Sequence, residues 1–246
     1  MQKTKYKNDP ISEVICEFKF SPDTQWDPSI AGFFYREVMA DYPIKETRVG
    51  KNVEFVSEDS GIRQKINSVE YLACLNASRN QVVQITTRTL IINHLAPYTH
   101  WEAFFPVIQK VFHSLQSVTE LKGIEKIGLR YINKIKIPEK AFELNKYFEY
   151  YPNLGNLPGC NHFMVGCMIP YNNNRDLARI QLTPANNQEP DTSIIILDID
   201  FFLHLIDETV NVDNALSWVD DAHSTVCKIF EACIKDTLRA LFNKER

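Results

Sequence analysis

The chain has 246 residues, of which 44% are hydrophobic and 24% are charged, so it can bury a substantial core and is not a disordered segment. Its formal net charge of -4 argues against a protein that binds duplex nucleic acid through bulk positive charge. No apolar run approaches the roughly 20 residues that span a bilayer, and the N-terminal residues lack the apolar core of a signal peptide, so we expect a cytoplasmic protein without a membrane segment.

Apolar and charged residues alternate from residue 11 to residue 20, which predicts a half-buried strand. Asp27-Pro28 supplies a helix N-cap with proline at the first helical position, so we expect a helix from there to Tyr42-Pro43. A region of short strands with short connections follows, and such connections are typical of antiparallel pairing. The expected strands are 53–56, 62–66, 71–75, 82–86 and 89–93.

A long helix is expected from about Thr99 to about Thr119, because large apolar residues recur there at three- and four-residue spacing. Thr99 and Glu102 match a capping box at its start. Pro106 lies inside this span, so we expect either a kink at that residue or a helix that begins at Phe105.

The same order of signals then starts again. We expect a strand at 128–137, a short helix at about 142–150, and strands near 163–169, 177–182 and 194–202. Asp213 is the expected N-cap of the longest helical pattern, which continues to residue 242. Each half reads as strand, helix, antiparallel meander and long helix. We therefore predict an α+β protein of two pseudo-repeated halves, residues 1–122 and 123–246, that form one globular unit.

This order of elements resembles the TATA-binding-protein-like fold. The resemblance implies that each half is an antiparallel sheet with a long helix on its back, and that the halves meet about a pseudo-dyad. A helix-grip fold is the main alternative. Likeness in the order of elements carries no information about function.

Several stretches carry a closer resemblance: Pro10-Ile11-x-Glu13-Val14 with Phe18 and Phe20, Leu129-Arg130-Tyr131-Ile132-Asn133, Leu197-Asp198-Ile199-Asp200, and Trp218 to His223 with Phe230-Glu231. In these stretches the chain is similar to a family of uncharacterised, sporadically distributed prokaryotic proteins of similar length. The family has no established activity. Its patchy distribution implies mobile genes, such as toxin-antitoxin or phage-defence modules.

The cysteines indicate a reducing compartment. Several of them fall inside strand or helix patterns and no Cys-x-x-Cys occurs, so we expect buried thiols rather than disulfides or a zinc site. They are Cys16, Cys74, Cys160, Cys167, Cys227 and Cys233.

Asp198 and Asp200 are two residues apart in an expected strand, so their carboxylates share one face at about 7 Å along the strand. Such a pair can hold Mg²⁺ or Mn²⁺ for phosphoryl chemistry, but spacing fixes no third ligand. The alternative, which we favour, is that they form ion pairs with cations of neighbouring strands. The candidate cations are Arg130, Lys134, Lys136 and Arg179.

His223 follows Asp220 and Asp221, and an imidazole held by a carboxylate is a general base in many hydrolases. Its place on the apolar stripe of the last helix favours a hydrogen-bonded core histidine instead, donating to Asp198 or to a backbone carbonyl. The chain has no nucleophile elbow, Walker loop, dinucleotide fingerprint or histidine spacing of a zinc enzyme, so we expect no cofactor and no resident metal.

If helices cover one side of the sheet, the other side presents charges of both signs, including Glu13 and Glu17 with the four cations and two aspartates above. A surface of mixed charge suits a protein partner better than it suits the phosphates of a nucleic acid. We expect a non-enzymatic partner-binding protein, antitoxin-like or an accessory of a prokaryotic defence module. The alternatives are a metal-dependent phosphodiesterase or nuclease that uses Asp198, Asp200 and His223, and a single-stranded nucleic-acid platform that adds Tyr131 to the cations.

Overall fold

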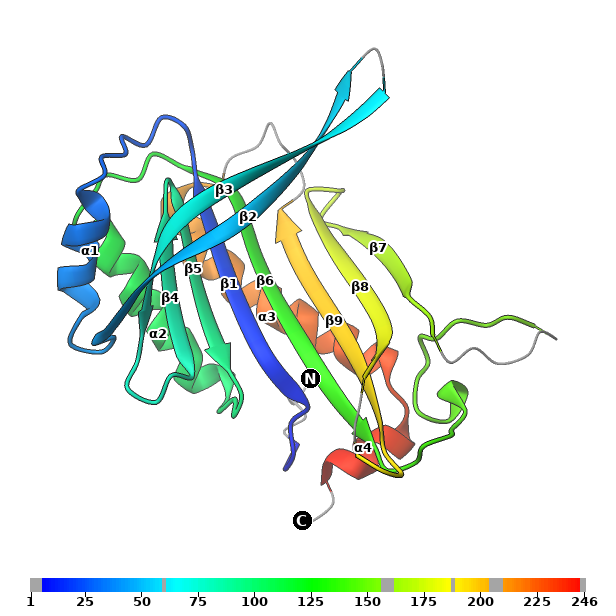
Figure 1. Ribbon diagram of the computed structural model, residues 1–246. Coiled ribbons are helices and arrows are strands. Elements are labelled where there is room, and N and C mark those ends of the chain that lie inside the picture. Colours follow the sequence, from blue (N-terminus) through cyan, green and yellow to red (C-terminus); the bar gives the residue numbers. More distant parts are fainter. Residues whose placement is uncertain (1–5, 59–60, 156–161, 187–188, 204–209, 244–246) are drawn as a thin grey trace.

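The computed structural model describes residues 6–58, 61–155, 162–186, 189–203 and 210–243 (Figure 1). The first part of the chain forms β1 Ile11–Phe20, α1 Ile30–Val38, β2 Ile44–Glu58, β3 Gly61–Leu75, β4 Gln81–Thr86, β5 Thr89–Leu95 and α2 Trp101–Gln116. The second part forms β6 Ile124–Ile137, the 3-10 turn η1 Leu144–Lys146, β7 Val165–Tyr171, β8 Asp176–Ala185, β9 Ser193–Leu203, the 3-10 turn η2 Val212–Asn214, α3 Ala215–Cys233 and α4 Asp236–Asn243.

All nine strands belong to one antiparallel sheet in the order β2-β3-β4-β5-β1-β6-β9-β8-β7. The predicted α+β class with an antiparallel sheet is therefore confirmed. The central pair is β1 with β6, and the strands that precede α2 lie on one side of this pair while the later strands lie on the other. Strands far apart in sequence thus form the middle of the sheet.

Helices α2 and α3 lie against one face of the sheet and leave the other face open (Figure 1). Alternation along the strands explains the core, because every second side chain points at the helices. In β1 the helix-facing residues Val14, Cys16, Phe18 and Phe20 are fully buried, and in β9 Leu197 and Ile199 are as well. Burial of one such aliphatic or aromatic side chain contributes about 1.5–3 kcal/mol, so this face holds the sheet and helices together.

The expected strands at 53–56 and 62–66 are parts of a much longer hairpin. Its two strands, β2 and β3, have 15 residues each and pair without interruption from Ile44–Leu75 to Glu58–Gly61. Only Leu72 to Leu75 of β3 also pair with β4, and the tip of the hairpin extends beyond the other strands (Figure 1). Before Leu72, the described backbone of β3 pairs with β2 alone, so the length of this arm is set by its own ladder.

The helix ends differ from those expected. The N-cap of α2 is His100, whose Nδ1 accepts a hydrogen bond from the backbone N–H of Ala103 at 3.1 Å, so the expected capping box at Thr99 is wrong. Pro106 lies within α2. Asp213 lies inside η2, and Asn211 caps that turn by accepting from the Asp213 N–H at 3.0 Å.

The last helix is not continuous, and the short helix expected at 142–150 is a single 3-10 turn. Both departures have one cause. Ile234 is extended and forms a β-bridge with Phe148, and the N–H of Lys235 donates to the carbonyl of Tyr147 at 2.9 Å. Each segment gives up helical hydrogen bonds because the other satisfies its backbone groups.

Candidate functional site

The open face of the sheet carries rows of charge whose sign alternates from strand to strand. We call this surface the charged face. Residues two apart on a strand share a face, and the register sets which residues are neighbours. The rows are negative on β1 (Glu13, Glu17) except for Lys19 at its end, positive on β6 (Lys126, Arg130, Lys134, Lys136), negative on β9 (Asp198, Asp200) and positive on β8 (Arg179). All the charged residues predicted for a binding surface therefore lie together.

The two aspartates form ion pairs with arginines on the neighbouring strands, as favoured from the sequence. Arg130 binds both carboxylate oxygens of Asp198, through Nε at 2.7 Å and Nη2 at 2.5 Å. Arg179 donates from Nη2 to Asp200 at 2.9 Å. The hydrogen bonds to Asp198 raise the pKa of Arg130, while burial raises the pKa of Asp200 against the opposing charges of Arg179 and Arg130.

Most other charges of this face also have partners. Lys126 pairs with Glu17 at 3.0 Å and Lys136 contacts Glu189. Glu13 accepts a hydrogen bond of 2.6 Å from the amide of Asn93. Lys134 is exposed. Most charges of this face are therefore balanced by a neighbouring group, and the face is not a strip of unbalanced positive charge.

The sheet separates the three residues of the predicted enzyme alternative. Asp198 and Asp200 lie on the charged face, whereas His223 projects from α3 on the helix side. Within the described residues no group of three or more histidine, cysteine or acidic side chains is placed to hold a metal ion. Tyr131, expected to join the cations, also faces the helices. The enzyme and nucleic-acid alternatives both need these side chains on one surface, but the charged face and the helix side of the sheet hold them apart.

His223 is enclosed by a cluster that the sequence did not reveal. Its ring stacks on that of Trp101 at 4.1 Å between centroids and 6° between planes, and its Nδ1 is 2.7 Å from the hydroxyl oxygen of Tyr131. The sulfur of Cys227 is 3.7 Å from Nδ1 and 3.6 Å from Nε2. Because the two distances are nearly equal, the sulfur does not lie in line with either ring nitrogen. His223 is thus held as a core residue, as favoured from its place on the apolar stripe.

Neither carboxylate near His223 in sequence orients the imidazole. Asp220 instead accepts a hydrogen bond of 2.7 Å from the indole nitrogen of Trp101, which joins α3 to the start of α2. Asp221 is exposed. The expected donation from His223 to Asp198 is also wrong, because the sheet lies between them. The spacing of His223 and Cys227, one helical turn apart, is the signal from which their contact could have been predicted.

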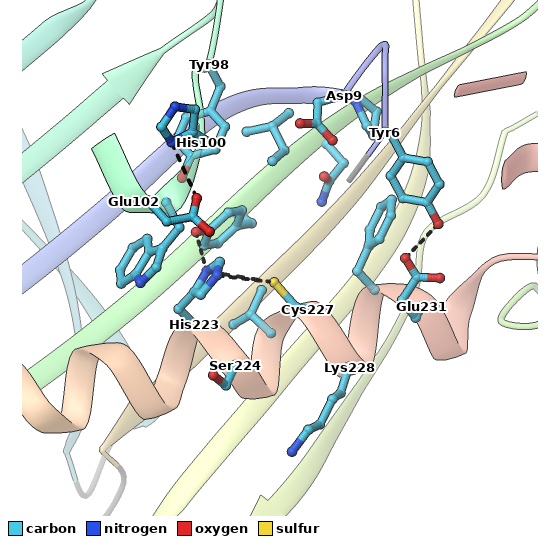
Figure 2. Close-up of a pocket in the computed structure, with 17 residues that line it drawn as sticks. Tyr6, Asp9, Tyr98, His100, Glu102, His223, Ser224, Cys227, Lys228 and Glu231 are labelled. Carbon is cyan, nitrogen blue, oxygen red and sulfur yellow. Dashed lines mark hydrogen bonds and ion pairs between the residues drawn. The ribbon is translucent and has the colours of Figure 1, made fainter. Parts of the chain in front are cut away.

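A cavity of about 300 Å³ opens beside this cluster (Figure 2). Four parts of the chain form its walls: the N-terminal segment before β1, the residues around the start of α2, the middle of β6 and one face of α3. The lining surface is mainly apolar, and several ionisable groups also contribute to it. Those that matter below are Tyr6, Asp9, Tyr98, Glu102, Lys228 and Glu231.

The hydroxyls of the cavity keep their protons at neutral pH. Burial is the largest cause that raises the pKa of Tyr131 and of Tyr98. Tyr6 donates to Glu231 at 2.6 Å, and burial together with this hydrogen bond raises its pKa. The Tyr98 hydroxyl is buried but has no partner of hydrogen-bond geometry in the described part of the chain. Of the residues that line the cavity, only His223 and Tyr131 were singled out from the sequence as candidate functional residues.

Among the described residues, no helix is long and apolar enough to cross a membrane. No known protein-family model matches the chain, and a comparison with curated proteins finds no match. The resemblance to a family of uncharacterised prokaryotic proteins therefore stays an expectation.

Proposed function

We propose that this is a non-enzymatic protein that binds a protein partner on the charged face. The observation that supports the proposal is the alternation of negative and positive rows across β1, β6, β9 and β8 on a sheet face that α2 and α3 leave open. Alternating rows make a pattern that a partner with the complementary pattern recognises, because mismatched rows bring like charges together.

Apolar side chains between the charges favour a protein over a nucleic acid. Ile15, Ile132 and Ile196 lie on this face and are only half buried. Met168 on the edge strand β7 is opposite Arg179 and 61% exposed. Protein interfaces combine an apolar centre with polar groups at the rim, and methionine and arginine are enriched in them.

Phosphate binding is the weaker alternative. Arg130, Arg179 and Lys126 are each already within hydrogen-bond distance of a carboxylate. A nucleic-acid backbone would have to displace these carboxylates, which would then repel it. Counterion release, the main source of affinity for nucleic acids, needs cations whose charge is not already balanced.

The enzyme alternative has lost its geometric support, since the sheet separates His223 from the two aspartates.

We also propose that the halves 1–122 and 123–246 derive from one repeated unit. The strand order supports this, because β5, β4 and β3 follow β1 outward as β9, β8 and β7 follow β6. An antitoxin-like or defence-accessory context rests on the family resemblance alone.

The test begins with isolation of the tagged full chain from cells that naturally express it, followed by chemical crosslinking and identification of the retained protein. That protein is then purified and its affinity measured by calorimetry. Lys134→Glu and Met168→Asp change exposed side chains of the charged face, so each should weaken binding at least about tenfold. Lys122→Glu, with the same charge change outside the sheet, is the control. Equal affinity of all three variants, or no retained protein, would refute the proposal.

A further inference from the structure

The cavity beside α3 has walls made of aromatic rings. Tyr98, Trp101, Tyr131 and Phe230 all line it, and Tyr6 closes it from the N-terminal segment (Figure 2). Tyr98 packs edge-on against Tyr131 at 6.2 Å between centroids, which fixes both rings. The face of an aromatic ring carries negative electrostatic potential, so a space enclosed by several rings attracts a cation that has little hydration to lose.

The charged groups of the lining are mainly acidic. Asp9, Glu102 and Glu231 contribute carboxylates, while Lys228 is the one ammonium group among the described lining residues. Figure 2 shows that Lys228 points away from the cavity on the outer side of α3. The lining therefore combines aromatic rings with an excess of negative charge. Trp101 is itself stacked on His223 and Phe105, so the rings left to meet a cation are those of Tyr6, Tyr98, Tyr131 and Phe230.

Two of these carboxylates are already engaged and one is not. Glu231 pairs with Arg239 at 2.9 Å and accepts from Tyr6. Glu102 is 3.3 Å from the ring of His100. Asp9 is exposed and has no side-chain hydrogen bond or ion pair to another described residue, and its partial burial raises its pKa. A carboxylate of this kind is stabilised when a cation enters the space beside it.

The cavity also holds a polar atom that needs a partner. The buried Tyr98 hydroxyl has no partner of full hydrogen-bond geometry among the described residues, although the Tyr131 hydroxyl is near enough to oppose the rise of its pKa. Burial is the main cause that raises the pKa of this hydroxyl, and the charges of Asp9 and Glu102 add to the rise. A buried polar group without a well-placed partner destabilises the protein, so a ligand that supplies one gains affinity from it.

We propose that this cavity binds a small organic cation, an alkylated ammonium group with a hydroxyl nearby. The volume of about 300 Å³ accommodates on the order of ten non-hydrogen atoms, since a water molecule takes up about 30 Å³ in the liquid. A bare metal ion fits poorly, because aromatic walls cannot replace its oxygen ligands. The cation is held by ring faces and Asp9, and its hydroxyl pairs with Tyr98.

Choline is the probe, because it has a trimethylammonium group and a hydroxyl, and 3,3-dimethyl-1-butanol is its neutral isostere. Calorimetric titration of the full chain should show one choline site and affinity at least about tenfold weaker for the isostere, since the isostere has no charge for the rings or Asp9 to attract. Phosphocholine should also bind more weakly than choline, because its phosphate would face Asp9, Glu102 and Glu231.

Variants locate the site. Asp9→Asn should weaken choline binding by about tenfold, whereas Asp221→Asn, which removes an exposed carboxylate elsewhere, should not change it. Tyr98→Phe keeps the ring and should weaken choline about threefold while leaving tetramethylammonium unaffected. Its melting temperature should not fall, so weaker binding cannot come from unfolding.

No binding heat with millimolar choline would overturn the proposal. So would equal affinity for choline and its isostere, tighter binding of phosphocholine, or an Asp9→Asn variant that binds like the original protein. These outcomes are independent of the charged face, because the cavity lies on the other side of the sheet.

Discussion

The ion pair between Arg130 and Asp198 offers a sharp test of the charged face. The side chain of Asp198 is 11% exposed and that of Arg130 is 35% exposed. Breaking a fully buried pair costs about 3–5 kcal/mol, whereas an exposed pair contributes about 0–1 kcal/mol. Because one partner is nearly buried and the other is a third exposed, Arg130→Ala should lower the free energy of unfolding by about 2–3 kcal/mol.

The loss should depend on pH. Burial already raises the pKa of Asp200, and Arg130 is one of three cations that oppose this rise, with Arg179 and, as the smallest contribution, Lys126. Without Arg130 the folded chain should bind a proton at Asp200 at higher pH than the unfolded chain, whose aspartate pKa is about 3.9. A group with a raised folded pKa favours the folded state as pH falls through that value. The cost of Arg130→Ala should therefore shrink between pH 7.5 and pH 4.5.

Urea unfolding at the two pH values measures both effects. Lys126→Ala is the matched control on the same strand and face, and because Lys126 is 47% exposed it should cost less than about 1 kcal/mol. Replacing both partners, as Arg130→Met with Asp198→Leu, should recover most of the stability, since no buried charge is left alone. A cost of Arg130→Ala no larger than that of the control, and the same at both pH values, would refute the reasoning.

Three further predictions follow from buried groups. Burial lowers the pKa of His94, so the unfolded chain binds a proton at this residue more readily than the folded chain. The free energy of unfolding, measured with urea, should therefore fall as pH drops below about 6.5, and His94→Gln should reduce this dependence on pH. Trp218→Phe should cost about 1–3 kcal/mol in the same assay, because the indole donates at 3.1 Å to the fully buried Asp176. An alkylating reagent should modify the partly exposed Cys167 and Cys227 before the three buried cysteines, Cys16, Cys74 and Cys233, as followed by peptide mass spectrometry. Burial raises the pKa of Cys74 to about 11 and that of Cys233 to about 12, and it encloses Cys16. Equal rates of modification would contradict this.

The alternation of side chains along a strand allowed the sequence alone to predict which face of the sheet each residue occupies. In β9 it separates Leu197 and Ile199, which face the helices, from Asp198 and Asp200, which do not. The same rule placed the predicted binding residues on one face. It works because the period of a strand is a local property of the backbone.

The partners of these residues were decided by tertiary structure. Arg130 binds Asp198 across 68 residues of sequence, and the cluster at His223 joins α2, β6 and α3. The break at Ile234 likewise depends on Phe148, which lies far away in the chain. A sequence pattern specifies which way a side chain faces, but strand register and helix packing bring distant side chains together, so the cavity and the pairs of the charged face required the folded chain.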